Sequence, residues 1–410
     1  MAIFLVLPVY LYTFLSEGFI LSFLTSLFAM LGFYIFFHFK HSFFQTGFFL
    51  GILLFYWIGL SFRYYNLTWM IPVIILFIGI GYGLIFFILN KIFNLFKFSI
   101  FHFPFSILLW LLFIAFGFDY IRPFTFDWLK PEIFLVNSYF GITKIAFLVF
   151  LIGIYSLKNK KSIAVTLLTL SIFLRIYQTP HIKMPDLKIF LATTHIPQNK
   201  KWQQNFIPIE IQNNFNIIQK AINKHYSVVV LPESSFPLFL NLYPTLMGKL
   251  IKLSTKITIV TGALHYKNKK FFNSTYIFEN KKVTVLDKHI LVPFGEYIPL
   301  PFFQKEINKI FFAGASDYKT SSHFGIFTIK NYKFINAICY EATIEKLYKL
   351  KPKYIIALTN DAWFKPSIEP VIQKLLIKLY AYKYKKIVFH SLNEYKSYII
   401  NGKLKMENGK

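Results

Sequence analysis

The sequence predicts a multi-span α-helical membrane domain followed by an α/β extramembrane domain. The chain has 410 residues, of which 55% are hydrophobic and only 15% are charged, a composition typical of membrane proteins. Most of the charged residues fall in the second part of the chain. We therefore expect a transmembrane domain over residues 1–178, an extramembrane domain over residues 186–400 and a polar tail over residues 401–410.

The first domain contains apolar runs that approach the roughly 17–25 residues needed to span a bilayer. They cover Ala2–Leu15, Phe19–Phe37, Phe43–Leu60, Trp69–Leu89, Phe101–Phe118, Val136–Tyr155 and Ser162–Ile176. The pattern predicts about seven transmembrane helices. Lys144 lies inside the sixth run, near its predicted outer end, where a long side chain can extend to the interface.

Lysines occur in alternate loops of this domain, and the positive-inside rule assigns those loops to the cytoplasm. They are Lys40, Lys91, Lys97, Lys158, Lys160 and Lys161. The opposite loops contain Arg63, Arg122 and Lys130, balanced by Asp119, Asp127 and Glu132. An odd number of spans from a cytoplasmic N-terminus then places the second domain on the outer face of the membrane.

The formal net charge of +27 raises the possibility of a nucleic-acid partner. The lysines are scattered singly, however, and no basic helix or aromatic RNA-binding motif accompanies them. We expect no nucleic-acid partner. Attraction to anionic lipid headgroups and a codon bias toward lysine both remain as explanations of the charge.

The second domain alternates short apolar strands with amphipathic helices. Strands are predicted at LKIFLATT, SVVVL, ITIVTGAL, KVTVL, FINAI and YIIAL, and helices at Glu210–Asn223 and Ile368–Tyr384. Polar residues follow four of these strands: Glu233, Lys288, Cys339 and the pair Asn360 and Asp361. Ligands of α/β sheets bind at the carboxyl ends of strands, so we expect these residues to form a site.

Cys339 is the only cysteine of the chain, so it is either a buried small hydrophobic residue or a chemically used thiol. A carboxylate such as Glu233 can take the proton of a thiol as general base. An ammonium such as Lys288 favours the thiolate and stabilises the oxyanion of a tetrahedral intermediate. These residue types together indicate nucleophilic acyl transfer, although isolated Glu and Lys residues are more often solvated surface charges.

The surrounding segments resemble signature blocks of the carbon–nitrogen hydrolase (nitrilase-like) superfamily, and specifically of its membrane-bound apolipoprotein N-acyltransferase family. The four blocks are VVVLPESSFP, LDKHILVPFGEYIPL, AICYE and LTNDAWF, in the family's order. In the membrane domain, FQTGFFLGILLFYWIGL is similar to the family's Gly-punctuated third span. The resemblance implies an αββα sandwich attached to a multi-span membrane domain.

The resemblance also implies roles for individual residues. Glu233 would be the general base, Lys288 the oxyanion-stabilising cation and Cys339 the nucleophile. Supporting residues would be Glu296, Tyr340 and Glu341. Substrate-binding candidates are Trp202, which could instead be a packing aromatic, and Asn360, Asp361 and Trp363 of the block LTNDAWF.

The implied reaction has two steps. A phospholipid, typically phosphatidylethanolamine, gives a fatty acyl chain to Cys339 as a thioester, and the N-terminal α-amine of a diacylated apolipoprotein then accepts it.

The resemblance implies no metal or organic cofactor. It also implies a location in the bacterial inner membrane, with the catalytic domain in the periplasm. We expect a monomer. The apolar segment Leu300–Ala315 is a candidate lid or membrane-dipping arm.

The chain departs from the family pattern at its C-terminal side. No apolar run of spanning length follows Asp361, and Lys365 stands where the family commonly has Gly.

Two other functions remain open from the residues alone. One is a membrane-anchored amidase that uses water as the acceptor, and the other is a non-catalytic lipid-binding or transport protein.

Overall fold

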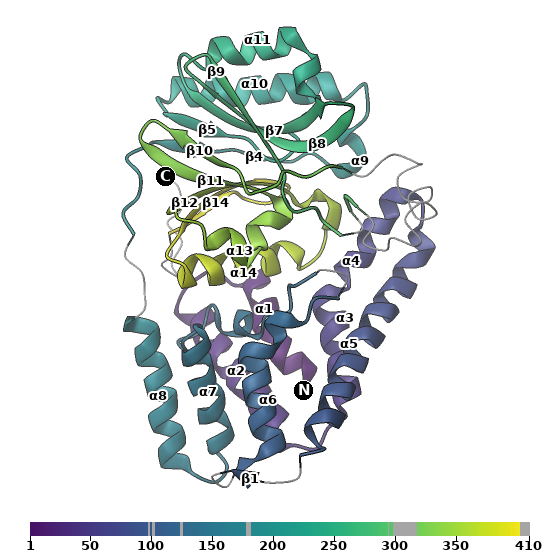
Figure 1. The fold of residues 1–410 in the computed structure, drawn as a ribbon, viewed down its shortest axis with the longest axis vertical. Helices are drawn as coiled ribbons and strands as arrows, with labels where there is room; N and C mark the ends of the chain where they lie inside the picture. The colour runs from purple at the N-terminus through teal and green to yellow at the C-terminus, as the bar shows by residue number, and fades with distance from the viewer. Residues whose placement is uncertain are drawn as a thin grey trace. The chain divides into compact units, whose positions relative to one another are not determined.

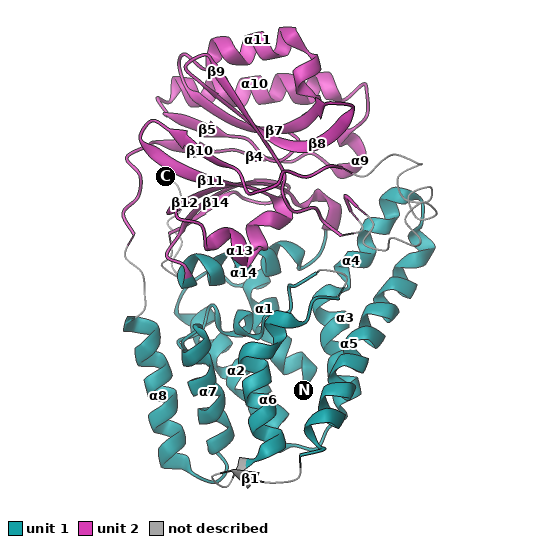
Figure 2. Ribbon diagram, in the orientation of Figure 1, with its two compact units in different colours: residues 1–180, 366–383, 403–405 teal, residues 181–365, 384–402, 406–410 magenta. Residues whose placement is uncertain are grey.

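The computed structural model describes residues 1–96, 99–100, 103–123, 126–177, 182–293, 295–297 and 318–401. The chain folds into two compact units (Figure 2). The first comprises residues 1–180, 366–383 and 403–405, and the second comprises residues 181–365, 384–402 and 406–410. The candidate arm Leu300–Ala315 and nearly all of the predicted polar tail lie outside the described residues.

The first unit is helical, and its longer helices follow the predicted apolar runs. They are α1 (Ala2–Phe14), α2 (Phe19–His38), α3 (Phe43–Phe55), α4 (Trp57–Leu60), α5 (Ile71–Phe93), α6 (Phe105–Phe116), α7 (Lys144–Ser156) and α8 (Lys161–Tyr177) (Figure 1). Among the described residues, two helices are long and apolar enough to cross a membrane, Phe19–His38 and Thr68–Phe93. A third candidate is the pair Phe43–Phe55 and Trp57–Tyr65, which is bent by 43°.

Helices α3 and α5 approach each other closely through glycines. A Cβ atom added at Gly47 would lie 2.3 Å from the carbonyl oxygen of Tyr82, and one at Gly51 would lie 2.8 Å from the Tyr82 side chain. Small residues four apart on one helix face allow two helix backbones to pack closely inside a membrane. This contact gives a physical reason for the Gly-punctuated third run.

The predicted sixth span begins too early. The sequence predicted helix from Val136, whereas α7 begins at Lys144. The preceding segment is instead irregular and polar at its edges. Lys144 forms ion pairs with Glu132 at 2.5 Å and with Asp119 at 2.9 Å, so its charge is neutralised at the helix start and does not lie within the run.

Helix α14 (Glu369–Lys383) belongs to the first unit, although it lies between two strands of the second unit in the sequence. Lys378 Nζ donates to Glu17 Oε1 at 2.9 Å and to Asn137 Oδ1 at 2.8 Å. Tyr382 Oη donates to the carbonyl oxygen of Arg175 at 2.8 Å. Hydrogen bonds to charged groups are worth about 1.5–3 kcal/mol, so these contacts hold α14 firmly to the helical unit.

The second unit contains two six-stranded sheets. The strands of the first sheet are β3 (Ile189–Leu191), β5 (Val228–Val230), β6 (Phe236–Phe239), β7 (Thr258–Lys267), β8 (Lys270–Glu279) and β9 (Lys282–Asp287). Those of the second sheet are β4 (Thr193–Thr194), β10 (Ile326–Ile329), β11 (Tyr332–Ile338), β12 (Tyr354–Asn360), β13 (Ile387–Asn393) and β14 (Tyr398–Ile400). The helices described in this unit are α9 (Gln198–Lys201), α10 (Ile207–Asn223), α11 (Pro244–Leu253) and α13 (Glu345–Tyr348).

The two sheets pack face to face. One buried cluster joins Val228, Val230 and Val260 of the first sheet to Ile356 and Phe389 of the second. A second cluster joins the opposite face of the first sheet to α10 and α11, whose positions are visible in Figure 1. Because alternate residues of a strand face opposite sides, consecutive valines of β5 contribute to different clusters. The predicted helical membrane domain followed by an α/β sandwich is confirmed.

One predicted strand proves to be two. The segment LKIFLATT was predicted as a single strand, but β3 pairs with β5 in the first sheet and β4 pairs with β13 in the second. The chain changes sheets at Ala192, whose N–H donates to Val230 O at 2.9 Å and whose carbonyl accepts from Ser391 Oγ at 2.7 Å. The sequence pattern of one short segment does not show which strand each half pairs with, because that pairing depends on residues far away in the chain.

Candidate active site

The four predicted site segments leave the carboxyl ends of strands, as expected. Lys288 follows β9 directly, Cys339 follows β11 directly, and Glu233 follows β5 by three residues. Asn360 is the last residue of β12. The two sheets of the sandwich therefore both contribute to one candidate active site.

The Glu233 carboxylate is buried and held by two donors. Asn273 Nδ2 donates to Oε1 at 2.8 Å, and the backbone N–H of Asn360 donates to Oε2 at 3.0 Å. Burial raises the pKa of Glu233, against the opposing effect of the Lys288 charge. A carboxylate with a raised pKa is a stronger base than an exposed glutamate, which suits proton transfer from a thiol.

Lys288 is completely buried and lies at the centre of the charged groups. Its Nζ forms an ion pair with Glu296 Oε2 at 2.7 Å. Burial alone would lower the pKa of Lys288, but the charge of Glu296, then those of Glu233 and Cys339, raise it above the ordinary value for lysine. Lys288 therefore remains an ammonium.

Glu296 joins the two halves of this charge cluster. Its Oε1 accepts from Asn273 Nδ2 at 2.9 Å, while its Oε2 accepts from Val292 N at 2.8 Å. The Asn273 amide thus donates to Glu296 and to Glu233 together, which fixes the spacing of the two carboxylates around Lys288. The two carboxylates repel each other, and the Asn273 amide and the Lys288 ammonium oppose that repulsion.

Cys339 begins a short 3₁₀ helix, Cys339–Thr343, and has a left-handed backbone with φ of 54°. A non-glycine residue in this region is strained by about 1–3 kcal/mol, and such strain is concentrated at functional sites. The Cys339 side chain is partly exposed, which differs from the buried small residue that was the alternative prediction. Its neighbour Tyr340 is buried.

Glu341 ties the turn of Cys339 to the loop that follows Lys288. Its Oε2 accepts from Ile338 N at 2.8 Å, and its Oε1 accepts from His289 N at 2.7 Å and from Ile290 N at 3.1 Å. Burial raises the pKa of Glu341 to about 7, against the opposing effect of the Lys288 charge and these N–H groups. The carboxylate therefore holds the turn of Cys339 and the loop after Lys288 together by backbone hydrogen bonds.

The candidate substrate-binding residues occupy different environments. Trp202 is 42% exposed and so is not a buried packing aromatic. Asn360 and Asp361 are buried, with Asn360 contributing to the support of Glu233, and Trp363 is half-buried. Of these four candidates, Trp202 and Trp363 have side chains that are not buried.

Comparison with known proteins identifies the family. Residues 1–178 match the family model described as the apolipoprotein N-acyltransferase integral membrane domain. The apolipoprotein N-acyltransferase of Wolinella succinogenes is 37% identical over 372 residues, which cover 88% of this chain and 85% of that protein. The chain belongs to the apolipoprotein N-acyltransferase family. The Helicobacter pylori member is also 37% identical, over 89% of this chain and 84% of that protein.

Solved structures similar to this apolipoprotein N-acyltransferase family member include a CN-hydrolase superfamily protein and amidases. A superfamily protein from Xanthomonas campestris has a TM-score of 0.42 and 13% identity, covering 55% of this chain and 86% of that chain. An amidase from Nesterenkonia sp. has a TM-score of 0.40 and 9% identity, covering 55% of this chain and 87% of that chain. The family assignment rests on the sequence relatives.

Sequence reasoning missed Asn273 and Lys201, both of which contact Glu233 in this member of the apolipoprotein N-acyltransferase family. Asn273 lies within β8, in a segment that was not singled out as a strand. The available signal for Asn273 was its position in the segment FFNST, where a single amide lies between two aromatic residues and two small polar residues. Lys201 appeared to be one of many scattered lysines, and only its 1% side-chain exposure distinguishes it.

The replacement of Gly262 by Ala is expected to reduce acyl transfer strongly and to lower the thermal unfolding midpoint. A Cβ atom there would lie 2.5 Å from Ser234 N and 2.7 Å from Glu233 Cα, so the loop of Glu233 must move. Gly248→Ala is the matched control because a Cβ at Gly248 meets nothing within 4 Å and Ala favours helix α11. Equal activity of the two variants, measured with purified protein in detergent, would contradict the close packing.

Proposed function

We propose that Cys339 accepts the acyl chain as a thioester during the acyl transfer to apolipoproteins that characterises this family. The observation that supports this most directly is a pair of hydrogen-bonded bridges. Asn273 joins Glu233 to Glu296, which forms the ion pair with Lys288, and Glu341 joins the backbone beside Lys288 to the backbone beside Cys339. A base, a thiol and a cation within electrostatic reach of one another are the parts that nucleophilic acyl transfer requires.

In the first step, the Cys339 thiol loses its proton to Glu233 and its sulfur attacks the ester carbonyl of a phospholipid. Lys288 stabilises the oxyanion of the tetrahedral intermediate. The C–O ester bond breaks, and the lysophospholipid leaves as an alcohol after Glu233 returns the proton. The acyl chain is then bound to Cys339 as a thioester.

In the second step, the α-amine of an S-diacylglyceryl-cysteine at the N-terminus of an apolipoprotein attacks the thioester. An N–C bond forms, the C–S bond breaks and the amine proton passes through Glu233 to the departing sulfur. Glu233 thus serves as base and then as acid in each half of a ping-pong reaction. The donor is a phospholipid, phosphatidylethanolamine in our proposal, and the chain acts as a monomer.

The periplasmic placement of the catalytic unit is supported by α14. Glu17 lies between the first two helices, in a loop that the positive-inside rule assigns to the outer side. Lys378 of α14 forms an ion pair with this residue at 2.9 Å. Because α14 connects β12 to β13, its contact with an outer loop is consistent with a catalytic unit on that side.

The test is intact-mass spectrometry of protein purified with native lipid, comparing the wild type with Cys339→Ala. We expect a mass increase equal to a fatty acyl group in the wild type, absent from the variant and discharged by a diacylated lipopeptide with a free α-amine. A wild type that remains unmodified after incubation with phospholipid would refute the acyl-enzyme. Release of the acyl group as a free acid, with no transfer to the amine, would favour hydrolysis.

A further inference from the structure

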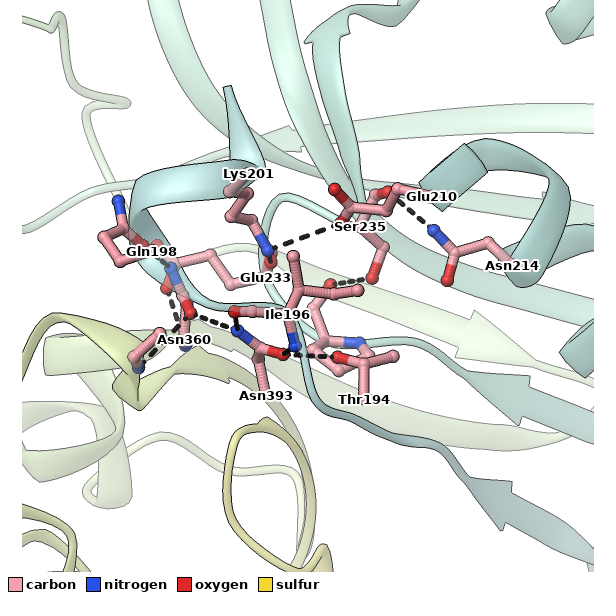
Figure 3. Close-up of polar contacts among 12 residues, drawn as sticks. Thr194, Ile196, Gln198, Lys201, Glu210, Asn214, Glu233, Ser235, Asn360 and Asn393 are labelled. Carbon is pink, nitrogen blue, oxygen red and sulfur yellow. Dashed lines mark hydrogen bonds and ion pairs between the residues drawn. The ribbon is translucent and has the colours of Figure 1, made fainter. Parts of the chain in front are cut away.

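A second lysine, Lys201, lies buried behind the proposed general base. It is the last residue of α9, and its side chain is 1% exposed. Lys201 Nζ donates to the backbone carbonyl oxygen of Glu233 at 3.3 Å and forms an ion pair with Glu210 Oε1 at 3.6 Å (Figure 3). The family resemblance assigned no role to either Lys201 or Glu210.

Lys201 and α10 together hold the backbone of the loop that contains Glu233. Ser234 has a left-handed φ of 49°, so the peptide between Glu233 and Ser234 is in an unfavourable orientation that needs support. Lys201 provides a donor for the carbonyl of this peptide. One turn along α10 from Glu210, Asn214 Nδ2 donates to Ser235 O at 2.6 Å.

Gln198, the first residue of α9, supports Glu233 on the side of the Glu233 carboxylate, through Asn360. Gln198 Oε1 accepts from Asn360 Nδ2 at 2.8 Å, and Asn393 Nδ2 donates to Asn360 Oδ1 at 2.7 Å. These bonds fix Asn360, whose backbone N–H donates to Glu233 Oε2. Figure 3 shows how α9 contributes to both ends of the glutamate, with Lys201 at the backbone and Gln198 toward the carboxylate.

The positive charge of Lys201 indicates that this residue does more than fill space in the core. Moving an ammonium out of water has an effective cost of several kcal/mol, which an apolar side chain of similar length would avoid. Burial lowers the pKa of Lys201, but the charges of Glu210 and Glu233 oppose that change. In turn, the Lys201 charge lowers the pKa of Glu233, an effect smaller than that of Lys288.

We propose that Lys201 is a positioning residue that holds the peptide after Glu233 and keeps a positive charge beside that carboxylate, with Glu210 as its counterion. The inference rests on the proposed role of Glu233 as general base. The charged groups around Glu233 are Lys288, Glu296 and Lys201, and those around Lys201 are Glu210, Glu233 and Glu394. Among the residues that the structure describes, Lys288 and Lys201 are the cations that act on Glu233, so removing Lys201 makes an anion in the site harder to form.

The test variant is Lys201→Met/Glu210→Gln, which removes the pair together and leaves no unpaired buried charge. Two rates are measured against pH: acylation of Cys339 by phospholipid, and alkylation of Cys339 by iodoacetamide. Alkylation reports only on this residue because the chain has one cysteine. We expect acylation to slow by on the order of 10-fold or more. We also expect the rise of both rates with pH to shift to higher pH.

Two single variants separate positioning from a structural role. Lys201→Arg keeps the charge and should retain the wild-type pH profiles. Lys200→Met removes the adjacent, exposed lysine of α9 and should change neither rate. A double variant that is slower at every pH with unshifted profiles, or that matches the wild type, would overturn the inference. Failure of wild-type acylation would instead refute the proposed function, and the alkylation profiles would still decide the role of Lys201.

Discussion

Replacement of Glu233 by Gln is expected to slow acylation of Cys339 by about 10²–10⁴-fold, the usual contribution of a general base. The side chain keeps its shape but loses its basicity. It also loses one of its two acceptor contacts, because its amide group must face either Asn273 Nδ2 or Asn360 N, and both are donors. The measurement is single-turnover formation of the acyl-enzyme, followed by intact mass.

The matched control is Glu279→Gln at the other end of β8. Glu279 accepts from Lys330 N at 3.1 Å and lies six residues along the strand from Asn273. A strand rises about 3.3 Å per residue, so this carboxylate is about 20 Å from the site. An acylation rate of Glu233→Gln equal to that of the control would remove Glu233 from the mechanism.

The parts of the site that follow strands could be predicted from the sequence. An apolar strand that ends in a polar residue is a local pattern, and Cys339 and Lys288 each follow such a strand directly. The two residues belong to different sheets, and each lies at the carboxyl end of its strand, where ligands of α/β folds bind.

The supporting residues could not be predicted in the same way because their roles depend on pairs far apart in the chain. Gln198 and Asn360 are 162 positions apart, and Glu233 and Asn360 are 127 positions apart. Lys201 differs from its exposed neighbour Lys200 only through burial, which one sequence does not reveal. The early start predicted for α7 had a similar cause, since the ion pairs of Lys144 with Asp119 and Glu132 also depend on tertiary structure.

Replacement of Lys288 by Met is expected to abolish acylation and to destabilise the catalytic unit. Its ammonium is 2.7 Å from Glu296 Oε2, and its removal leaves the buried carboxylate of Glu233 and the partly buried carboxylate of Glu296 without their main cation. Breaking one partner of a buried ion pair typically costs about 3–5 kcal/mol. Thermal unfolding in detergent should show a clearly lower midpoint for this variant than for Glu279→Gln.

The double variant Lys288→Met/Glu296→Gln separates stability from catalysis. Neutralising Glu296 removes one unpaired charge, so the unfolding midpoint should recover in part. Acylation should remain absent, because the variant lacks the ammonium that is proposed to stabilise the oxyanion. If the double variant instead formed the acyl-enzyme at the wild-type rate, Lys288 would be a counterion for two buried carboxylates and not part of the acyl-transfer mechanism.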